Sequence, residues 1–176
     1  MRAAGATNGL VAVSPQRTVH APARLSAAPV APALTARDIG LVRTSFARIA
    51  PTKDLTADLF YDRLFFIAGD LRALFPDDLA EQKKKLMAIL STAVGRLDNL
   101  AAIAPAVKAL GARHAGYSTR PEHYAIVAEA LLWTLQQGLG DAFTPEMKSA
   151  WTKVYTVLAD TMQQGASEAA ALRAAE

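Results

Sequence analysis

Near the middle of the chain, a short helical run ends in a histidine that could hold a metal ion. Val107, Leu110 and Gly111 recur at helical spacing before His114, so the four residues share one face of a predicted helix. This face is apolar and points inward, and Gly111 leaves room beside the histidine for something flat to approach. An imidazole in this setting either ligates a metal or is a core histidine satisfied by its neighbours, and the residues alone leave both interpretations open.

Two other polar side chains stand in apolar surroundings. Gln82 lies near the start of a predicted helix, on the same face as Leu86, and this helix could pack opposite His114. Tyr61 lies among leucines and phenylalanines, where its hydroxyl needs a hydrogen-bond partner. These residues predict a cofactor held between helices, as in helical bundles.

The elements that must position these residues are all predicted to be helices. No segment alternates as a strand does, so we expect an all-α fold of about seven helices. Their boundaries follow from capping residues, prolines and glycines: a helix begins at the Thr35-x-x-Asp38 motif and ends at Pro51, one runs through Leu55 and Leu64 to Gly69, a short turn covers Leu71–Phe75, one begins at the Asp78-x-x-Glu81 motif, and the others span Ile103–Ala115, Pro121–Gly138 and the chain from Thr144 onward.

Composition narrows the class of protein. The chain has 176 residues, of which 52% are hydrophobic, but no uninterrupted apolar run approaches the roughly 20 residues that span a bilayer. We therefore expect a soluble protein without a membrane span. The first 37 residues contain four arginines and no acidic residue, so the remainder is nearly neutral, which argues against nucleic-acid binding.

The chain contains no cysteine. This excludes disulfides, iron–sulfur clusters and prosthetic groups held through thiols, so any metal must be held by His, carboxylate or Tyr. It is compatible with a cytoplasmic location, which we expect. Residues 1–33 are predicted to be a disordered extension, with a targeting or docking segment as the alternative; 34–165 form the domain, and the Ala-rich end 166–176 is expected to fray.

Several short motifs follow one another at a definite spacing between residues 34 and 163. They are Leu59-Phe60-Tyr61, Leu74-Phe75, Glu81-Gln82 with Leu86, Pro105-Ala106-Val107-Lys108 leading to His114, His123-Tyr124, and Ala150-Trp151-x-Lys153-x-Tyr155. In this order they resemble the globin family, most closely the single-domain haemoglobins of bacteria and the globin domain of flavohaemoglobins. The resemblance implies a globin fold around a haem pocket, with haem b as cofactor.

The resemblance also implies roles for individual residues. His114 matches the proximal ligand of the haem iron, and Phe75 matches the phenylalanine that packs on the porphyrin. Tyr61 and Gln82 match the distal pair that can donate hydrogen bonds to bound dioxygen. Leu86 matches the apolar distal wall.

Other positions complete the expected pocket. Leu110 and Val127 match residues that contact the cofactor, and Lys85 either reaches a haem propionate or lies on a solvated face. Tyr124 matches a tyrosine that, in flavohaemoglobins, joins a glutamate in a network around the proximal histidine. The glutamate position is Ala166 here, and the nearest polar residues are Gln163, Gln164 and Glu168, which argues against peroxidase-like chemistry.

Three functions are consistent with these features. The first is reversible binding of dioxygen, and of carbon monoxide and nitric oxide, for oxygen storage or transport. The second is a nitric oxide dioxygenase that works with a separate reductase, since no flavin domain is expected before the chain ends at Glu176. The third is a gas or redox sensor or an interaction module. Either a monomer or a homodimer is compatible with the sequence.

Overall fold

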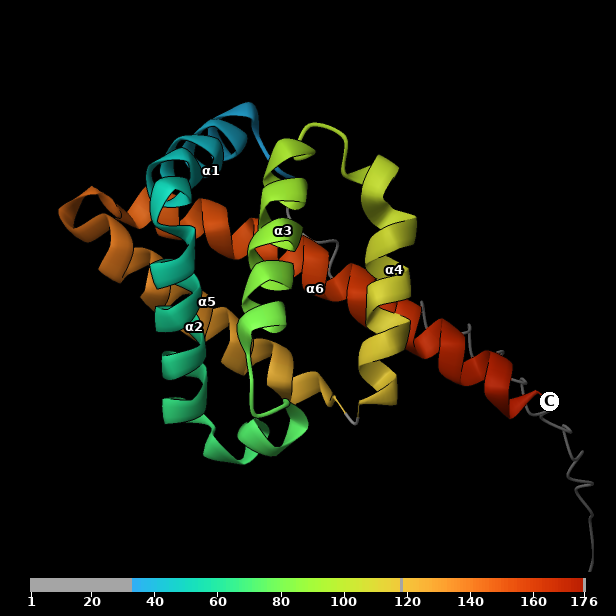
Figure 1. Cartoon of the computed structure of the whole chain (residues 1–176). Coiled ribbons are helices and arrows are strands. Elements are labelled where there is room, and N and C mark those ends of the chain that lie inside the picture. The colour runs from blue at the N-terminus through green and yellow to red at the C-terminus, as the bar shows by residue number, and fades with distance from the viewer. Residues whose placement is uncertain (1–32, 118, 176) are drawn as a thin grey trace, which may run out of the picture. The chain divides into compact units, whose positions relative to one another are not determined.

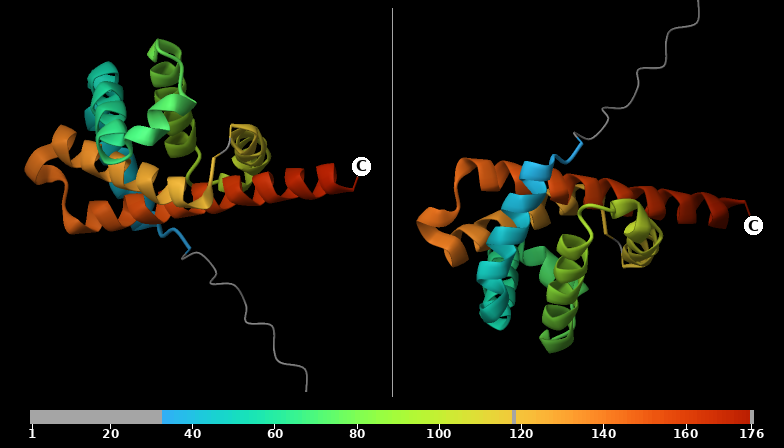
Figure 2. Two further views of the ribbon diagram at one scale, coloured as in Figure 1. Left: turned by 90° about the horizontal axis from the view of Figure 1, so that it is seen from below. Right: turned by 90° about the horizontal axis from the view of Figure 1, so that it is seen from above.

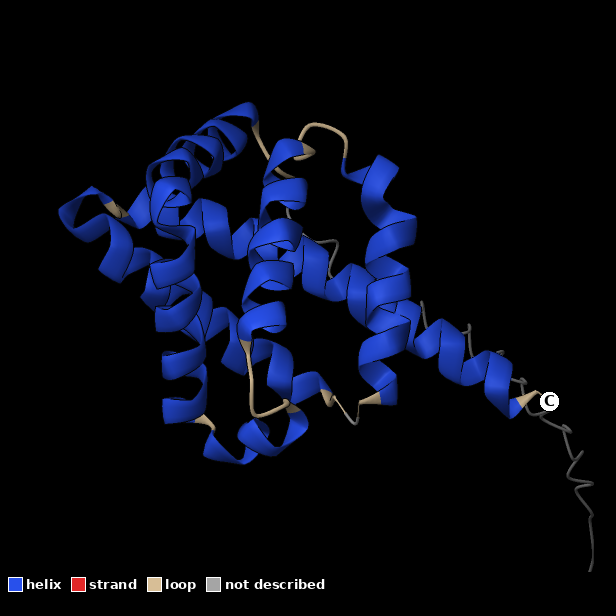
Figure 3. Cartoon of the chain, in the orientation of Figure 1, coloured by secondary structure: helices blue, strands red, loops and turns tan. Residues whose placement is uncertain are grey.

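The computed structural model describes residues 33–117 and 119–175, and these residues belong to one compact unit that spans 31–176. The segment 1–33, expected to be disordered, lies outside the described residues except for Ala33. Figure 3 shows helices joined by short loops, and no strand occurs in the described part. The prediction of an all-α fold is confirmed.

The described residues form six α-helices, where about seven helices were expected, and three short 3₁₀ turns. Their bounds are α1 Ala36–Ile49, η1 Ala50–Thr52, α2 Lys53–Ile67, η2 Gly69–Leu74, α3 Ala80–Gly95, α4 Leu100–Gly116, α5 Pro121–Leu139, η3 Gly140–Ala142 and α6 Pro145–Ala174. The turn predicted at Leu71–Phe75 is the 3₁₀ turn η2. Helix α6 continues to Ala174, so the segment expected to fray from residue 166 is helical up to that point.

Local signals place most helix starts. Thr35 and Asp38 form the predicted capping box of α1, and Thr144 caps α6 by accepting a hydrogen bond from the backbone of Met147. The predicted capping box of α3 is wrong. That helix starts at Ala80, whose backbone N–H donates to the Asp78 carboxylate (2.9 Å), while Glu81 pairs with Lys84 instead.

Helix α4 begins three residues earlier than predicted. Asn99 caps it by accepting a hydrogen bond from the backbone N–H of Ala102 (3.3 Å), so the helix starts at Leu100 rather than at Ile103.

The helices form two layers, which are clearest in the views from below and from above in Figure 2. In Figure 1, α5 and α6 lie behind α2, α3 and α4; α2 packs on α5, and α4 crosses and packs on α6. The core between the layers is centred on fully buried side chains that include Val42, Leu64, Leu135 and Trp151. As a result, His114 on α4 is supported mainly by α6, whereas Tyr61 and Gln82 come from the adjoining pair α2 and α3.

Candidate functional site

His114 lies in the last turn of α4 and is half-buried. Its Nδ1 atom is 2.9 Å from the backbone carbonyl oxygen of Leu110. A carbonyl only accepts hydrogen bonds, so Nδ1 carries the proton and Nε2 keeps a lone pair. A metal-ligating histidine needs this arrangement, in which one ring nitrogen is fixed by a backbone oxygen and the other is available.

The sequence suggested that Gly111 opens space beside His114. The structure shows that it does not. Gly111 is buried against α6, and a Cβ atom at this position would collide with the backbone of Met162. The missing side chain admits the neighbouring helix rather than a flat ligand. Sequence periodicity alone could not reveal this because the contact joins residues 51 positions apart in the chain.

Tyr61 is buried in a cluster of aromatic rings. Its ring centroid lies 5.1 Å from that of Phe60, 5.9 Å from that of Phe65 and 5.7 Å from that of Phe75. Burial raises the pKa of Tyr61 to about 12, so the hydroxyl stays protonated at neutral pH and can act as a donor. It forms no hydrogen bond with another described residue.

Gln82 lies in the first turn of α3. Its side-chain Oε1 atom is buried and has no hydrogen-bond partner among the described residues. A buried amide oxygen without a partner is rare in folded proteins and costs stability, so it calls for a functional explanation.

Phe75 follows η2, is half-buried, and packs edge-on against Phe65, with 5.4 Å between ring centroids. The turn that carries Phe75 is held by Arg72. Its guanidinium donates to the carbonyl oxygens of Phe75 (3.1 Å), Pro76 (2.9 Å) and Asp77 (3.1 Å). Sequence analysis missed Arg72; the available signal was a residue with five donors just before a proline-containing turn.

The remaining predicted pocket residues differ in their surroundings. Leu86 and Val127 are half-buried and pack against the main core, and Leu110 is half-buried on α4. Lys85 is exposed. Within the described residues Lys83 pairs with Asp58 and Lys84 with Glu81, whereas Lys85 has no carboxylate partner.

The groups expected around a proximal network are not joined to His114. The Tyr155 hydroxyl donates to the backbone carbonyl of Tyr124 (2.6 Å), and burial raises the pKa of both phenols. Glu168 instead forms an ion pair with Lys108, with 2.7 Å between Oε1 and Nζ. No hydrogen bond between described residues connects His114 with Tyr124 or with a carboxylate.

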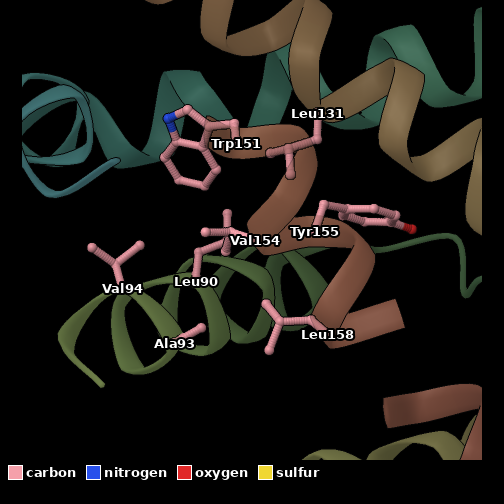
Figure 4. Close-up of a pocket in the computed structure, with 8 residues that line it drawn as sticks. All are labelled: Leu90, Ala93, Val94, Leu131, Trp151, Val154, Tyr155 and Leu158. Carbon is pink, nitrogen blue, oxygen red and sulfur yellow. The ribbon is translucent and has the colours of Figure 1, made fainter. Parts of the chain in front are cut away.

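A small apolar cavity of about 20 Å³ lies between α3, α5 and α6. Figure 4 shows side chains from α3, α5 and α6 directed toward it: Leu90, Ala93, Val94, Leu131, Trp151, Val154, Tyr155 and Leu158. Leu90 stands one turn after Leu86 on α3. The cavity has room for about one water-sized molecule.

Comparison with known protein families identifies the family to which this sequence belongs. The sequence model of the globin family matches residues 58–162, more than half of the chain. This chain belongs to the globin family. The predicted resemblance to globins and to the globin domain of flavohaemoglobins is therefore confirmed. Globins bind haem and, through it, diatomic gases.

The globin is similar to proteins of different size. It is 38% identical over 104 residues to a flavohemoprotein of Bacillus subtilis, covering 57% of this chain but only 26% of that protein. It is 28% identical over 146 residues to the neuroglobin of Tetraodon nigroviridis, covering 75% of this chain and 92% of the neuroglobin. Among solved structures, an engineered carbene transferase superposes on this chain with a TM-score of 0.73 at 25% identity. It was made from a candidate nitric oxide dioxygenase of Rhodothermus marinus, and the match covers 80% of this chain and 99% of that one.

None of the described helices is long and apolar enough to cross a membrane.

Proposed function

We propose that this globin binds dioxygen reversibly at a haem b group, with His114 as the protein ligand to the iron. The Gln82 amide, whose buried oxygen has no partner among the described residues, carries the proposal. Because no described residue holds this oxygen, the amide can turn so that its NH₂ group donates to a bound dioxygen, which itself only accepts hydrogen bonds.

The residues present fit a haem between α3 and α4. His114 offers Nε2, because Leu110 holds the proton of Nδ1. In this proposal the half-buried side chains of Phe75, Leu86, Leu110 and Val127 would form the apolar walls. Lys85, which is exposed and has no ion-pair partner among the described residues, is suited to a propionate. When bound, haem supplies an iron that takes up a diatomic gas.

The distal side chains then determine how long the gas stays. Tyr61 remains protonated because burial raises its pKa to about 12, so it donates at every physiological pH. The Gln82 NH₂ group is a second donor. Two donors directed at a ligand that gains negative charge stabilise it and slow its release.

On the opposite side, His114 lacks a carboxylate partner, because Glu168 is bound to Lys108. The hydrogen-bond partner of its imidazole is instead a backbone carbonyl. This favours gas binding over peroxidase-like chemistry, in which a carboxylate strengthens the histidine as a ligand.

The absorption spectrum of the purified protein tests the proposal. We expect a five-coordinate ferrous spectrum and a normal complex with carbon monoxide. A six-coordinate ferrous spectrum would contradict an open gas site and favour a sensor or redox role. Failure to take up haem even after reconstitution would leave only an interaction module.

A second candidate is a nitric oxide dioxygenase, favoured by the similarity to a flavohemoprotein and to the Rhodothermus protein. The reaction would convert one dioxygen, one nitric oxide and one electron into one nitrate, so each turnover needs an electron, which a separate reductase would supply. Adding nitric oxide to the oxygenated protein and measuring nitrate tests the chemistry. Repeated turnover with an added flavin reductase and a nicotinamide donor, against a control lacking the reductase, separates an enzyme from a carrier.

A further inference from the structure

Helices α4 and α6 touch backbone to backbone at two glycines. A Cβ atom on Gly111 would collide with the backbone of Met162, and a Cβ atom on Gly165 would collide with the backbone of Lys108. Both glycines are buried. Any larger residue at either position must separate the helices, because the atoms in the way are main-chain atoms and cannot rotate aside.

An ion pair joins the same two helices beside this crossing. The Lys108 ammonium lies 2.7 Å from the Glu168 carboxylate, and Glu168 is three residues after Gly165. Figures 1 and 2 show α4 alongside α6 from different directions. Among the described helices, α4 packs extensively only against α6.

The crossing lies directly behind the turn that orients His114. Gly111 is three residues before the histidine and follows Leu110, whose carbonyl oxygen accepts the hydrogen bond from Nδ1. A contact between main chains leaves less freedom than one between flexible side chains. The position of this turn is therefore set by how closely α6 approaches.

We propose that Gly165 is a positioning residue for the proximal histidine: the close approach at Gly111 and Gly165 fixes α4 and, with it, the direction of the His114 Nε2 atom toward the haem iron. This inference rests on the proposed function, in which His114 ligates that iron. The Lys108–Glu168 ion pair assists by holding the two helices in register.

The test uses full-length ferrous protein loaded with haem and the variant Gly165→Ala. We expect a shifted iron–histidine stretching frequency in the resonance Raman spectrum and about tenfold faster loss of haem to an acceptor apoprotein, since overpacking by one methyl group displaces the helix. The stretching frequency reports ligand geometry, which a purely structural role for Gly165 would leave unchanged.

Gly116→Ala is the matched control. Gly116 lies on α4 only two residues after His114, but an added Cβ would meet open space, so both readouts should stay at the wild-type values. Glu168→Gln removes the ion pair without adding volume and should speed haem loss by about twofold, as expected for a partly exposed pair.

An unchanged frequency in haem-loaded Gly165→Ala overturns the proposal. If that variant does not fold, Glu168→Gln decides, and unchanged haem loss overturns the proposal as well. A wild-type protein that takes up no haem overturns the proposed function instead, so the two failures are distinguishable.

Discussion

The Nδ1 atom of His114 donates to the carbonyl oxygen of Leu110, one turn earlier on the same helix, over 2.9 Å. This bond fixes the ring tautomer before any ligand arrives and leaves Nε2 as the metal-binding atom. We predict that His114→Ala loses most of its haem during gel filtration, as measured by the Soret absorbance per protein.

The matched control is His123→Gln. His123 is also buried, but its ring nitrogens lie 3.2 Å and 3.1 Å from the backbone nitrogen and Nε of Arg120 at the start of α5, where one of them accepts a hydrogen bond, so its loss should leave haem retention intact. Full retention in His114→Ala with a native spectrum would contradict the ligand assignment.

Tyr61 and Gln82 are predicted to slow the release of dioxygen. A hydrogen bond to a charged or partly charged group contributes about 1.5–3 kcal/mol, so Tyr61→Phe and Gln82→Leu should each speed dioxygen dissociation by about tenfold or more. Stopped-flow displacement measures the rates. Carbon monoxide is the internal control, because it gains less negative charge and should dissociate at nearly unchanged rates. Unchanged dioxygen rates in both variants would refute the donor assignment.

Gln82 should also cost stability in the haem-free protein. Its Oε1 atom is buried without a partner among the described residues, and such an atom costs about 1–3 kcal/mol. Gln82→Leu should therefore raise the unfolding free energy of the haem-free protein by about 1 kcal/mol, measured by urea unfolding, even as it weakens oxygen retention. A destabilised variant would mean that the amide already has a partner, such as water.

Helix positions could be predicted from sequence because their signals are local. The Thr35–Asp38 capping box and the prolines that open α5 and α6 act within one turn of the chain, and they lie where predicted. The start of α4 was missed because Asn99 caps it three residues before the apolar run becomes evident.

The surroundings of the candidate site were harder to predict, because they depend on contacts between distant segments. Gly111 has the same type and spacing whether a ligand or another helix fills the space beside it, and α6 fills it. Glu168 could have served the histidine, but its carboxylate meets Lys108, 60 residues earlier in the chain. Periodicity identifies the inward face of a helix, but it does not show whether another helix or a ligand packs against that face.

Ser45 and Trp151 form a buried hydrogen bond that connects α1 with α6. The Trp151 indole N–H donates to the Ser45 hydroxyl over 2.8 Å, and both residues are almost inaccessible to solvent. Ser45→Ala leaves the indole donor buried without a partner and should lower the unfolding free energy by about 1–3 kcal/mol. Urea unfolding followed by tryptophan fluorescence measures the loss. A cycle with Trp151→Phe isolates the hydrogen bond: if Ser45→Ala costs the same in that background, the bond contributes nothing.

Asp38 should make stability depend on pH in the acid range. The backbone N–H and hydroxyl of Thr35 donate to its carboxylate, the Lys153 ammonium lies 3.0 Å away, and together they lower the pKa of Asp38 from 3.8 to about 2. A lowered folded-state pKa means that the contribution, on the order of 2 kcal/mol, is fully present above about pH 4 and is lost as the pH falls through about 2. Asp38→Asn should therefore destabilise the protein at neutral pH, and the difference from wild type in urea unfolding should shrink toward zero near pH 2. Asp160→Asn, which alters an exposed carboxylate of α6 that has no ion-pair partner among the described residues, is the control for general effects of removing an acid. A difference between wild type and Asp38→Asn that stays constant from neutral pH down to about pH 2 would show that the carboxylate charge contributes nothing to the stability of this capping box.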